Sequence, residues 1–500
     1  MVAARDRERL GEVGAVAARY GLGALLARLG LEGLADGEGG ATAGSLPERT
    51  RRAIEELGPT FVKLGQILAT RRDLLPEDWI AELERLHSAA PTLSFEALRG
   101  TVETALGRPP EDAFASFDPE PLAAASMAQV HRATLKDGRA VVLKIRRPGI
   151  RRRMEADIRL IAHLAEIAER ASGEARRLAP TALVRQLAEA VLEELDFTHE
   201  GRNADRLAAD FADDPRVVIP AIHWPFSSER LLVMDYVEGV APRSGEALRA
   251  AGIDPAVIAD LGADLVLDMV LLNGRFHGDP HPGNLLCLPG NRLALLDLGL
   301  IGHVSPRRRE EFLRFIHALH GGDPAALADT LAAWSGDAGP PRARILAASE
   351  RLVARHSGGR LVLSALMRDF FSLLRQEGLV LPPDLMLIFK AMITMDGVLV
   401  AIQPDFDLTG SIERARLRIL MERLAPGRWS AKLDALALEL ARLGDDAPRL
   451  IRALVRRLEN EPAARPSGEP VARAILRAGM GIAGAILVSG LMVATALLLR

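Results

Sequence analysis

The sequence contains very little cysteine and very little lysine. Its single cysteine, Cys287, excludes an intrachain disulfide framework and a cysteine-based zinc site, and this usage fits a reducing compartment. Because Cys287 lies in an apolar run, we expect a buried structural thiol. Of the 63 basic residues only five are lysines, so arginine carries nearly all of the positive charge. Where such a chain keeps a lysine inside a motif, the site favours a compact ammonium over a planar guanidinium.

The chain also lacks a strong charge of either sign. Its net charge of -3 gives no general electrostatic case for binding nucleic acid, so we expect no nucleic-acid partner. Residues 1–34 show helical spacing without the charged-then-apolar layout of a cleaved signal peptide. A length of 500 residues with 49% hydrophobic content is enough for a large core and predicts roughly two to four domains.

The segment His277–Asn284 joins an acid, a rigid turn and an amide. Asp279 is followed five residues later by Asn284. Kinase-like phosphotransferases use this spacing, with the Asp facing the acceptor and the Asn holding a metal ion. Two short apolar runs separated by Pro289-Gly290-Asn291 then predict a hairpin. This hairpin would return Asp297 to the neighbourhood of Asn284 and give two oxygen ligands for Mg²⁺.

Residues 114–145 change to a strand-and-turn pattern. The β-rich run 140–145 contains Lys144 near its end, the position of the lysine that holds the α and β phosphates in a kinase-like lobe. The upstream phosphate-covering loop should be rich in glycine, but here it reads Ala123, Ala124, Ala125 and Ser126. Each alanine adds a Cβ and restricts φ, so we expect an altered nucleotide pose.

Two further strands are predicted at 217–220 and 231–239. The second one runs into a turn and resembles the hinge that joins two lobes and presents backbone groups to an adenine. On this interpretation Met234 and Tyr236 contribute to nucleotide binding.

One continuous helix is predicted from Thr181 to Phe211. Glu193, Asp196 and Glu200 lie at i, i+3 and i+7 and would share one face, with Glu194 beside it. One of these acids should pair with Lys144, as a kinase-like glutamate does. The spacing does not decide which one, and at least one of them should be solvated.

A second polar helix begins near Phe61. Lys63, Gln66 and Thr70 lie three and four residues apart and would share one face, and Pro76 ends the helix. Such a face is more often solvated surface than a functional site, so helical spacing alone leaves its role open.

Beyond Gly302 the pattern is helical with short breaks, and it predicts no chemistry. No Ala-Pro-Glu follows Asp297-Leu298-Gly299, and the interval to the helix predicted near Ser305 is too short for a peptide-docking activation segment. We therefore expect no protein substrate. Ala478–Leu499 is 22 residues without a charge, which as a helix of roughly 33 Å would cross a membrane. Two arginines before this span favour a cytoplasmic body.

These motifs together resemble the UbiB-type atypical kinases, a family of protein-kinase-like membrane proteins linked to ubiquinone biosynthesis. The resemblance covers residues 50–310. Lys63-Leu64-Gly65-Gln66 resembles the KxGQ signature, with Ala69 where a serine is usual and with Arg71, Asp73 and Pro76 completing the pattern. Further matches are the alanine-rich loop, Lys144, the ExD motif Glu194-Leu195-Asp196, and Asp279, Asn284 and Asp297.

The resemblance implies an α+β, bilobal protein-kinase-like fold with an N-terminal helical extension and a C-terminal transmembrane helix. Lys63, Gly65 and Gln66 would lie over the cleft and be held partly by Glu194 and Asp196. Glu200 would then be the partner of Lys144. The implied domains are an amphipathic helix and linker (1–45), the KxGQ extension (46–112), two lobes (113–238 and 239–425), helices and a linker (426–470), and the membrane segment (471–500).

The leading functional hypothesis is a membrane-anchored atypical kinase or ATPase that supports ubiquinone biosynthesis and uses ATP and Mg²⁺. Asp279 and Lys144 would be its catalytic residues. Its expected partners are a lipid membrane, a quinone precursor or other lipophilic small molecule, and other quinone-biosynthesis proteins. Its expected location is the inner (cytoplasmic) membrane, crossed once. Two alternatives are a small-molecule phosphotransferase of the aminoglycoside or choline kinase type, and a nucleotide-gated lipid-binding scaffold.

Overall fold

The computed structural model of the chain describes residues 4–28, 44–70, 75–86, 90–171, 179–336, 339–356, 363–379 and 381–424. The chain divides into two compact units, residues 1–420 and 421–500, and almost all of the described residues belong to the first. The predicted membrane span Ala478–Leu499 lies outside the described residues.

A helical layer opens the first unit. It comprises α1 (Ala4–Arg19), α2 (Gly23–Arg28), α3 (Leu46–Leu57), α4 (Pro59–Thr70) and α5 (Glu77–Leu83), which pack with α8 (Ile150–Ala171) and α10 (Pro180–Glu194). Asp157 of α8 is buried and accepts hydrogen bonds from Arg9 and Thr60, each at 2.8 Å. This carboxylate therefore joins α1 and α4 to α8. Pro76, expected to end the polar helix, stands at the N-cap of α5, and residues 71–74 between it and α4 lie outside the described residues.

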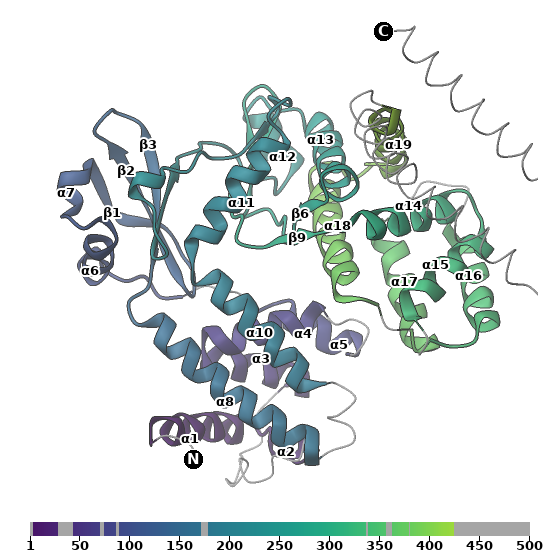
Figure 1. Ribbon diagram of the computed structural model, residues 1–500, viewed down its shortest axis with the longest axis horizontal. Coiled ribbons are helices and arrows are strands. Elements are labelled where there is room, and N and C mark those ends of the chain that lie inside the picture. The colour runs from purple at the N-terminus through teal and green to yellow at the C-terminus, as the bar shows by residue number, and fades with distance from the viewer. Residues whose placement is uncertain are drawn as a thin grey trace, which may run out of the picture. The chain divides into compact units, whose positions relative to one another are not determined.

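An antiparallel sheet with strand order β1-β2-β3-β5 follows (Figure 1). Its strands are β1 (Phe114–Ala124), β2 (Ala128–Leu135), β3 (Ala140–Arg146) and β5 (Leu231–Asp235). Val141, Leu143 and Ile145 point to one face, where α6 (Phe95–Leu106) covers them and they are fully buried. Because side chains alternate along a strand, Lys144 points to the opposite face.

The helix predicted from Thr181 to Phe211 is interrupted, so that prediction is wrong. α10 ends at Glu194, and α11 (Phe197–Asp210) begins after two intervening residues. Asp196 has extended backbone angles and its carboxylate accepts the N–H of Thr198, which makes it the N-cap of α11. The expected acidic face is therefore split between two helices.

Two short elements adjoin the first sheet. They are α7 (Pro110–Ala113), which leads into β1, and the 3-10 turn η2 (Trp224–Phe226), whose Phe226 packs against the core of this sheet. The remaining elements form the second lobe and its helices. They are β4 (Val217–Val218), α12 (Gly245–Ala250), α13 (Pro255–Asp268), the π-helical turn η3 (Met269–Asn273), β6 (Arg275–His277), β7 (Leu285–Leu288), β8 (Arg292–Leu295), β9 (Ile301–His303), α14 (Pro306–His320), α15 (Pro324–Ser335), α16 (Arg342–His356), α17 (Leu363–Glu377), α18 (Pro383–Ile402) and α19 (Leu408–Leu424). The predicted hairpin is confirmed as β7 and β8, with Gly290 and Asn291 at positive φ in its turn.

α18 is the central helix of this lobe. Phe389 on α18 packs against Phe312 and Phe315 of α14 and against Phe370 of α17. Its stretch Asp384–Ile402 is long and apolar enough to cross a membrane, but 61% of an 18-residue part of that stretch is buried inside the protein. The aromatic contacts account for this apolar composition, so we interpret α18 as a core helix.

Candidate phosphate and metal site

Lys144 is placed by the register of the first sheet. Lys144 pairs with Val130 of β2, and Val130 in turn pairs with Ala123 of β1. Residues paired across antiparallel strands point to the same face, so Ala123 lies on the face of the sheet that carries the lysine. The alanine-rich segment is shorter as a loop than expected, because Ala123 and Ala124 belong to β1. The connection to β2 spans Ala125–Met127.

Arginine holds this connection in place. The Arg147 side chain donates to the backbone oxygens of Ala125 at 2.9 Å and Pro91 at 2.7 Å. The backbone N–H of Arg147 donates to the oxygen of Met127 at 2.9 Å. Ser126 lies within this tethered connection.

Lys144 contacts two carboxylates. Its Nζ atom lies 2.9 and 2.8 Å from the two carboxylate oxygens of Glu200 and 3.4 Å from Oδ2 of Asp297. The side chains of Lys144 and Glu200 are only 16% and 7% exposed, whereas that of Asp297 is 48% exposed. The ion pair is therefore sheltered, and Asp297 keeps a solvent-facing side that can take a ligand.

The protonation states of this cluster follow from burial and mutual attraction. Burial lowers the pKa of Lys144, but the attraction of Asp297 and Glu200 outweighs this and raises it. Burial raises the pKa of Glu200 to about 7, because desolvation of its carboxylate exceeds the attraction of Lys144. For Asp297 burial acts upward, but Lys144 and a hydrogen bond from the N–H of Gly299 bring its pKa down to about 2. Asp297 is therefore ionised at neutral pH, as a metal ligand must be.

The carboxylates of the ExD motif do different things. Glu194, at the end of α10, forms an ion pair with Lys63 of α4. The attraction of Glu194 outweighs the burial of Lys63 and raises the pKa of this lysine. Asp196 instead caps α11, the helix that carries Glu200. Glu193 is exposed, and it is the solvated acid that was expected.

Gly65 and Gln66 fix the position of α4. A Cβ added to Gly65 would lie 2.3 Å from Cδ1 of Leu86, so a larger residue here would force the buried Leu86 side chain to shift. The Gln66 side chain donates to the backbone oxygen of Leu86 at 3.4 Å. Both residues therefore contact the segment that follows α5. Arg71 and Asp73, which completed the expected signature, lie outside the described residues.

The loop after β6 presents Asp279, whose side chain is 38% exposed. The Nδ2 atom of Asn284 donates to the backbone oxygen of Asp279 at 3.1 Å, and the N–H of Leu296 donates to the backbone oxygen of Asn284 at 2.9 Å. The second bond brings the end of the β7–β8 hairpin, and with it Asp297, to Asn284 at the end of the loop. The expected return of Asp297 toward Asn284 is therefore observed.

These residues suit Mg²⁺ better than a metal held by protein alone. Among the described residues no group of three or more His, Cys, Asp or Glu side chains could hold a metal ion. Asn284 uses its Nδ2 atom within the loop, so its Oδ1 atom is left to face a ligand, and Asp297 is ionised and half exposed. Mg²⁺ is commonly bound by one or two such oxygens together with substrate phosphates.

The buried side chain of His277 stabilises the loop that carries Asp279. Its Nδ1 atom accepts the N–H of Asp279 at 3.1 Å. Burial lowers its pKa to about 4, although Asp297 and Asp279 act in the opposite direction. The ring is therefore neutral at physiological pH and acts as a hydrogen-bond acceptor for the backbone of Asp279.

Sequence reasoning missed one residue of this site, Lys390 of α18. Its Nζ atom lies 3.3 Å from Oδ1 of Asp279, and the two side chains are 33% and 38% exposed. The sequence pattern of the helical region predicted no chemistry, yet this region places the Lys390 ammonium beside Asp279. The scarcity of lysine was a signal that could have identified it.

Met234 and Tyr236 lie where the first sheet leads into the second lobe. Met234 pairs with Val142 of β3, and the N–H of Tyr236 donates to the backbone oxygen of Ala140 at 3.0 Å. The guanidinium of Arg132 stacks on the Tyr236 ring at 4.2 Å. Farther along, Val240 forms a two-way backbone bridge with Cys287 of the hairpin. This segment therefore connects the two lobes, as the predicted hinge required.

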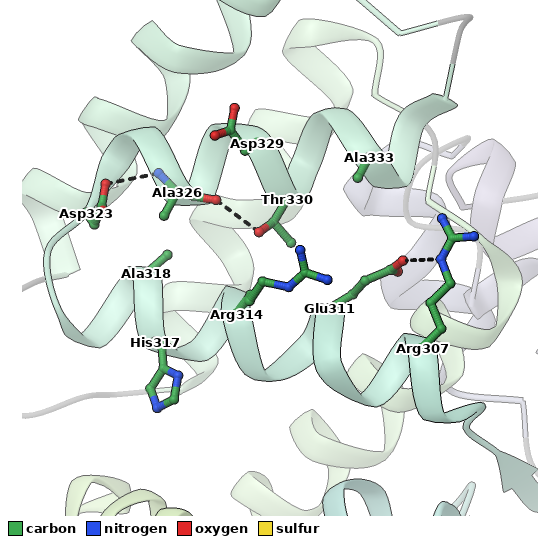
Figure 2. A pocket seen from close by; sticks show the side chains of 10 residues that line it. All are labelled: Arg307, Glu311, Arg314, His317, Ala318, Asp323, Ala326, Asp329, Thr330 and Ala333. Carbon is green, nitrogen blue, oxygen red and sulfur yellow. Dashed lines mark hydrogen bonds and ion pairs between the residues drawn. The ribbon is translucent and has the colours of Figure 1, made fainter. Parts of the chain in front are cut away.

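A surface cavity of about 480 Å³ lies apart from these groups, between α14 and α15 (Figure 2). Several of its polar side chains are engaged in local helix contacts. Asp323 caps α15, Thr330 bonds to the oxygen of Ala326, and Arg307 pairs with Glu311. Its lining includes none of the lysines and acids described above, so we do not assign it to the phosphate site.

Comparison with known proteins agrees with this geometry. Residues 85–331 match the model of the ABC1 atypical kinase-like domain, and residues 357–407 match that of the UbiB helical domain. A probable protein kinase UbiB from Marinobacter nauticus is 33% identical over 389 residues, covering 76% of this chain and 71% of that protein. A probable protein kinase UbiB from Xylella fastidiosa is 33% identical over 472 residues, covering 90% and 84%.

Among solved structures, the complex of Rv3197 with erythromycin from Mycobacterium tuberculosis aligns with a TM-score of 0.51. The identity is 24%, and the alignment covers 69% of this chain and 89% of that one. This likeness supports the kinase-like fold only. The family models and the two relatives above lead to one conclusion: the chain belongs to the UbiB family of ABC1 atypical kinase-like proteins.

Proposed function

We propose that this protein is a membrane-anchored ATPase or small-molecule kinase that uses ATP and Mg²⁺ and supports ubiquinone biosynthesis. The observation that carries the proposal is the arrangement around Lys144, whose ammonium contacts Glu200 and Asp297. A lysine held in this way by a glutamate, beside an aspartate that can bind Mg²⁺, is the arrangement that kinases use to hold ATP phosphates.

The residues have separate roles in this proposal. Lys144 contacts the α and β phosphates, and Glu200 fixes its ammonium. Asn284 and Asp297 would hold Mg²⁺, which would supply positive charge to the phosphate oxygens. Asp279 orients the attacking oxygen of water or an acceptor hydroxyl and accepts its proton. As that oxygen bonds to the terminal phosphorus, the bond from this phosphorus to the bridging oxygen breaks and ADP leaves with the bonding electrons.

The acceptor is inferred from the segment that follows Asp297-Leu298-Gly299. β9 begins at Ile301 and pairs with β6, and α14 begins at Pro306. This leaves little chain for a platform that could dock a peptide. Water or a small lipophilic acceptor is therefore a better substrate than a protein. Lys63 attaches the KxGQ helix α4 to Glu194 at the end of α10, and α10 contacts α11, which carries Glu200. An additional helix attached here would leave less room for a protein substrate, which supports this choice.

The membrane part of the proposal rests on the sequence and on the family. The charge-free stretch Ala478–Leu499 would anchor the chain in the inner (cytoplasmic) membrane with the kinase-like body in the cytoplasm. A quinone precursor or another lipophilic molecule would then reach the site from the bilayer. Other quinone-biosynthesis proteins are its proposed partners.

The test is phosphate release from ATP by the full chain in detergent, with and without anionic liposomes and with Mg²⁺ or excess chelator. We expect Mg²⁺-dependent release that falls by about 10²-fold or more in an Asp297→Asn variant. Asp137→Asn, in the exposed turn between β2 and β3, is the matched control and should behave as wild type. Equal turnover in Asp297→Asn and wild type would exclude the assigned metal site.

Two further measurements separate the alternatives. Stoichiometric transfer of phosphate to a hydroxylated small molecule would identify a soluble-substrate phosphotransferase. Restoration of quinone levels in deficient cells by an Asp279→Ala protein that still binds nucleotide would instead identify a nucleotide-gated scaffold.

A further inference from the structure

Lys390 reaches the catalytic loop from a helix that otherwise forms core. Its neighbours Phe389 and Ala391 are buried, whereas Lys390 is partly exposed and directs its ammonium to Asp279. In α18, Lys390 is the one basic side chain between Pro383 and Ile402. The contact therefore brings a cation from the helical domain to the residue proposed to orient the attacking oxygen.

Three of the five lysines of the chain converge on this site. Of the five lysines in the sequence, Lys63 pairs with Glu194, Lys144 with Glu200 and Asp297, and Lys390 with Asp279. The other basic residues are almost all arginines, and they form most of the remaining ion pairs. A compact ammonium on a flexible stem can move between a carboxylate and a phosphate oxygen more readily than a planar guanidinium.

Stability does not explain the contact between Lys390 and Asp279. Both side chains are about one-third exposed, and ion pairs of this kind contribute little to folding. α18 is already held by the packing of Phe389 and by an ion pair at 2.8 Å between Arg308 and Asp384 at its first turn. The position of α18 is therefore secured without Lys390.

Charge balance suggests what Lys390 does. Lys63 and Lys144 each have a close carboxylate of their own, whereas Asp279 has a 38% exposed side chain and lies in the loop that Asn284 holds through the Asp279 backbone oxygen. A terminal phosphate that enters next to Asp279 would be repelled by this carboxylate unless a cation lies at the same place. Lys390 supplies that cation, and its 3.3 Å separation from Oδ1 leaves the ammonium able to move to a phosphate oxygen.

We propose that Lys390 is a further catalytic residue that contacts the terminal phosphate of the bound nucleoside triphosphate. It pairs with Asp279 while the site is free and transfers its ammonium to the terminal phosphate when ATP binds. This frees the Asp279 carboxylate for the attacking oxygen and neutralises charge that develops on the transferred group. The inference rests on the proposed function, because it requires that ATP binds at Lys144.

The test compares two nucleotides that differ in the terminal phosphate. Binding of Mg²⁺ with ADP, and of Mg²⁺ with the β,γ-imido analogue of ATP, is measured by calorimetry on the full chain in detergent for wild type and Lys390→Met. We expect affinity for the imido analogue to fall by about tenfold or more, as for loss of a charged hydrogen bond, with unchanged affinity for ADP. Turnover of ATP should fall by about 10²-fold.

Three controls make this result specific. Lys136→Met removes an exposed lysine in the turn between β2 and β3 and should match wild type in both affinities. Lys144→Met should lose affinity for both nucleotides, because Lys144 contacts the phosphates that ADP retains. Lys390→Gln replaces Lys390→Met if the latter does not give folded protein, which is judged by thermal unfolding.

The outcomes separate the inference from the function on which it rests. A wild-type chain that binds neither nucleotide would overturn the proposed function and with it this inference. A wild-type chain that binds both, with Lys390→Met binding both equally well or weakening both equally, would overturn the role of Lys390 alone.

Discussion

Replacing Lys144 by Met should destabilise the protein in a way that depends on pH. The substitution removes the ammonium that lies within 2.9 Å of both carboxylate oxygens of Glu200. Glu200 remains almost fully buried, so its carboxylate must either stay charged without a partner or take up a proton. In the variant it takes up a proton more readily than in wild type.

The magnitude follows from the pKa of Glu200. This pKa is about 7 in the folded protein, compared with 4.5 for an unperturbed glutamate, even with Lys144 present. Without Lys144 it rises further, because the attraction that lowered it is lost. Below about pH 7 the carboxyl group is protonated in both folded proteins, so this group adds little difference in stability. Above pH 7 the difference grows by up to about 1.4 kcal/mol per pH unit.

The sign follows from proton binding. A carboxyl group whose pKa is raised on folding binds more protons in the folded state than in the unfolded state, so stability falls as pH rises through the folded-state pKa. The loss in Lys144→Met relative to wild type should therefore be about 2 kcal/mol greater at pH 8.5 than at pH 6.5. Asp297 adds little to this slope, since it is half exposed and ionised throughout this range.

Urea unfolding of the full chain in detergent, followed by tryptophan fluorescence, measures this difference. The double variant Lys144→Met/Glu200→Gln is the control, because it removes the group that titrates. We expect the double variant to be more stable than Lys144→Met at pH 8.5 and to lose the excess pH dependence, while nucleotide binding stays impaired. A Lys144→Met variant with the same loss at both pH values would refute the reasoning.

Three further predictions concern neighbouring positions. Gly65→Ala should lower the free energy of unfolding by about 1–3 kcal/mol, because the added Cβ would overlap Leu86. Gly11→Ala is the control and should cause no such loss, because the space around Gly11 is open. Equal shifts of the unfolding temperature in the two variants would contradict this. Asp196→Ala should lower the free energy of unfolding by about 1 kcal/mol, because α11 loses its N-cap, whereas Asp196→Ser should keep most of this stability. Equal losses of stability in the two variants, measured by thermal unfolding, would show that the cap is unimportant. Cys287 is buried and burial raises its pKa to about 12, so maleimide at pH 8 should modify it only after denaturation; rapid labelling of the native chain would oppose this.

Much of the phosphate site could be predicted from the sequence because its parts are local. The loop Asp279–Asn284, the hairpin that returns Asp297 and the strand that carries Lys144 are set by turn residues and short apolar runs. Such signals lie within a few residues of the positions that they determine. The assignment of Glu200 as the partner of Lys144 needed the family resemblance, since three other acids lay close to it in the sequence.

The break between α10 and α11 shows where local reasoning failed. Apolar periodicity continued through Leu195, so one helix was predicted from Thr181 to Phe211. Asp196 stops the helix by taking extended angles and capping the next one. An aspartate in a helical pattern is compatible with a solvated face or with a cap, and only its surroundings decide between them.

By itself the sequence determined the chemistry that neighbouring residues create together: an acid and an amide five residues apart, a hairpin that returns a second acid, and a buried thiol. Only the tertiary structure decided which charges meet across distant segments. Lys63 reaches Glu194 from α4, and Lys390 reaches Asp279 from α18, more than a hundred residues away. Ion pairs of this kind leave no periodic or local pattern, because they depend on how whole helices pack against the catalytic loop.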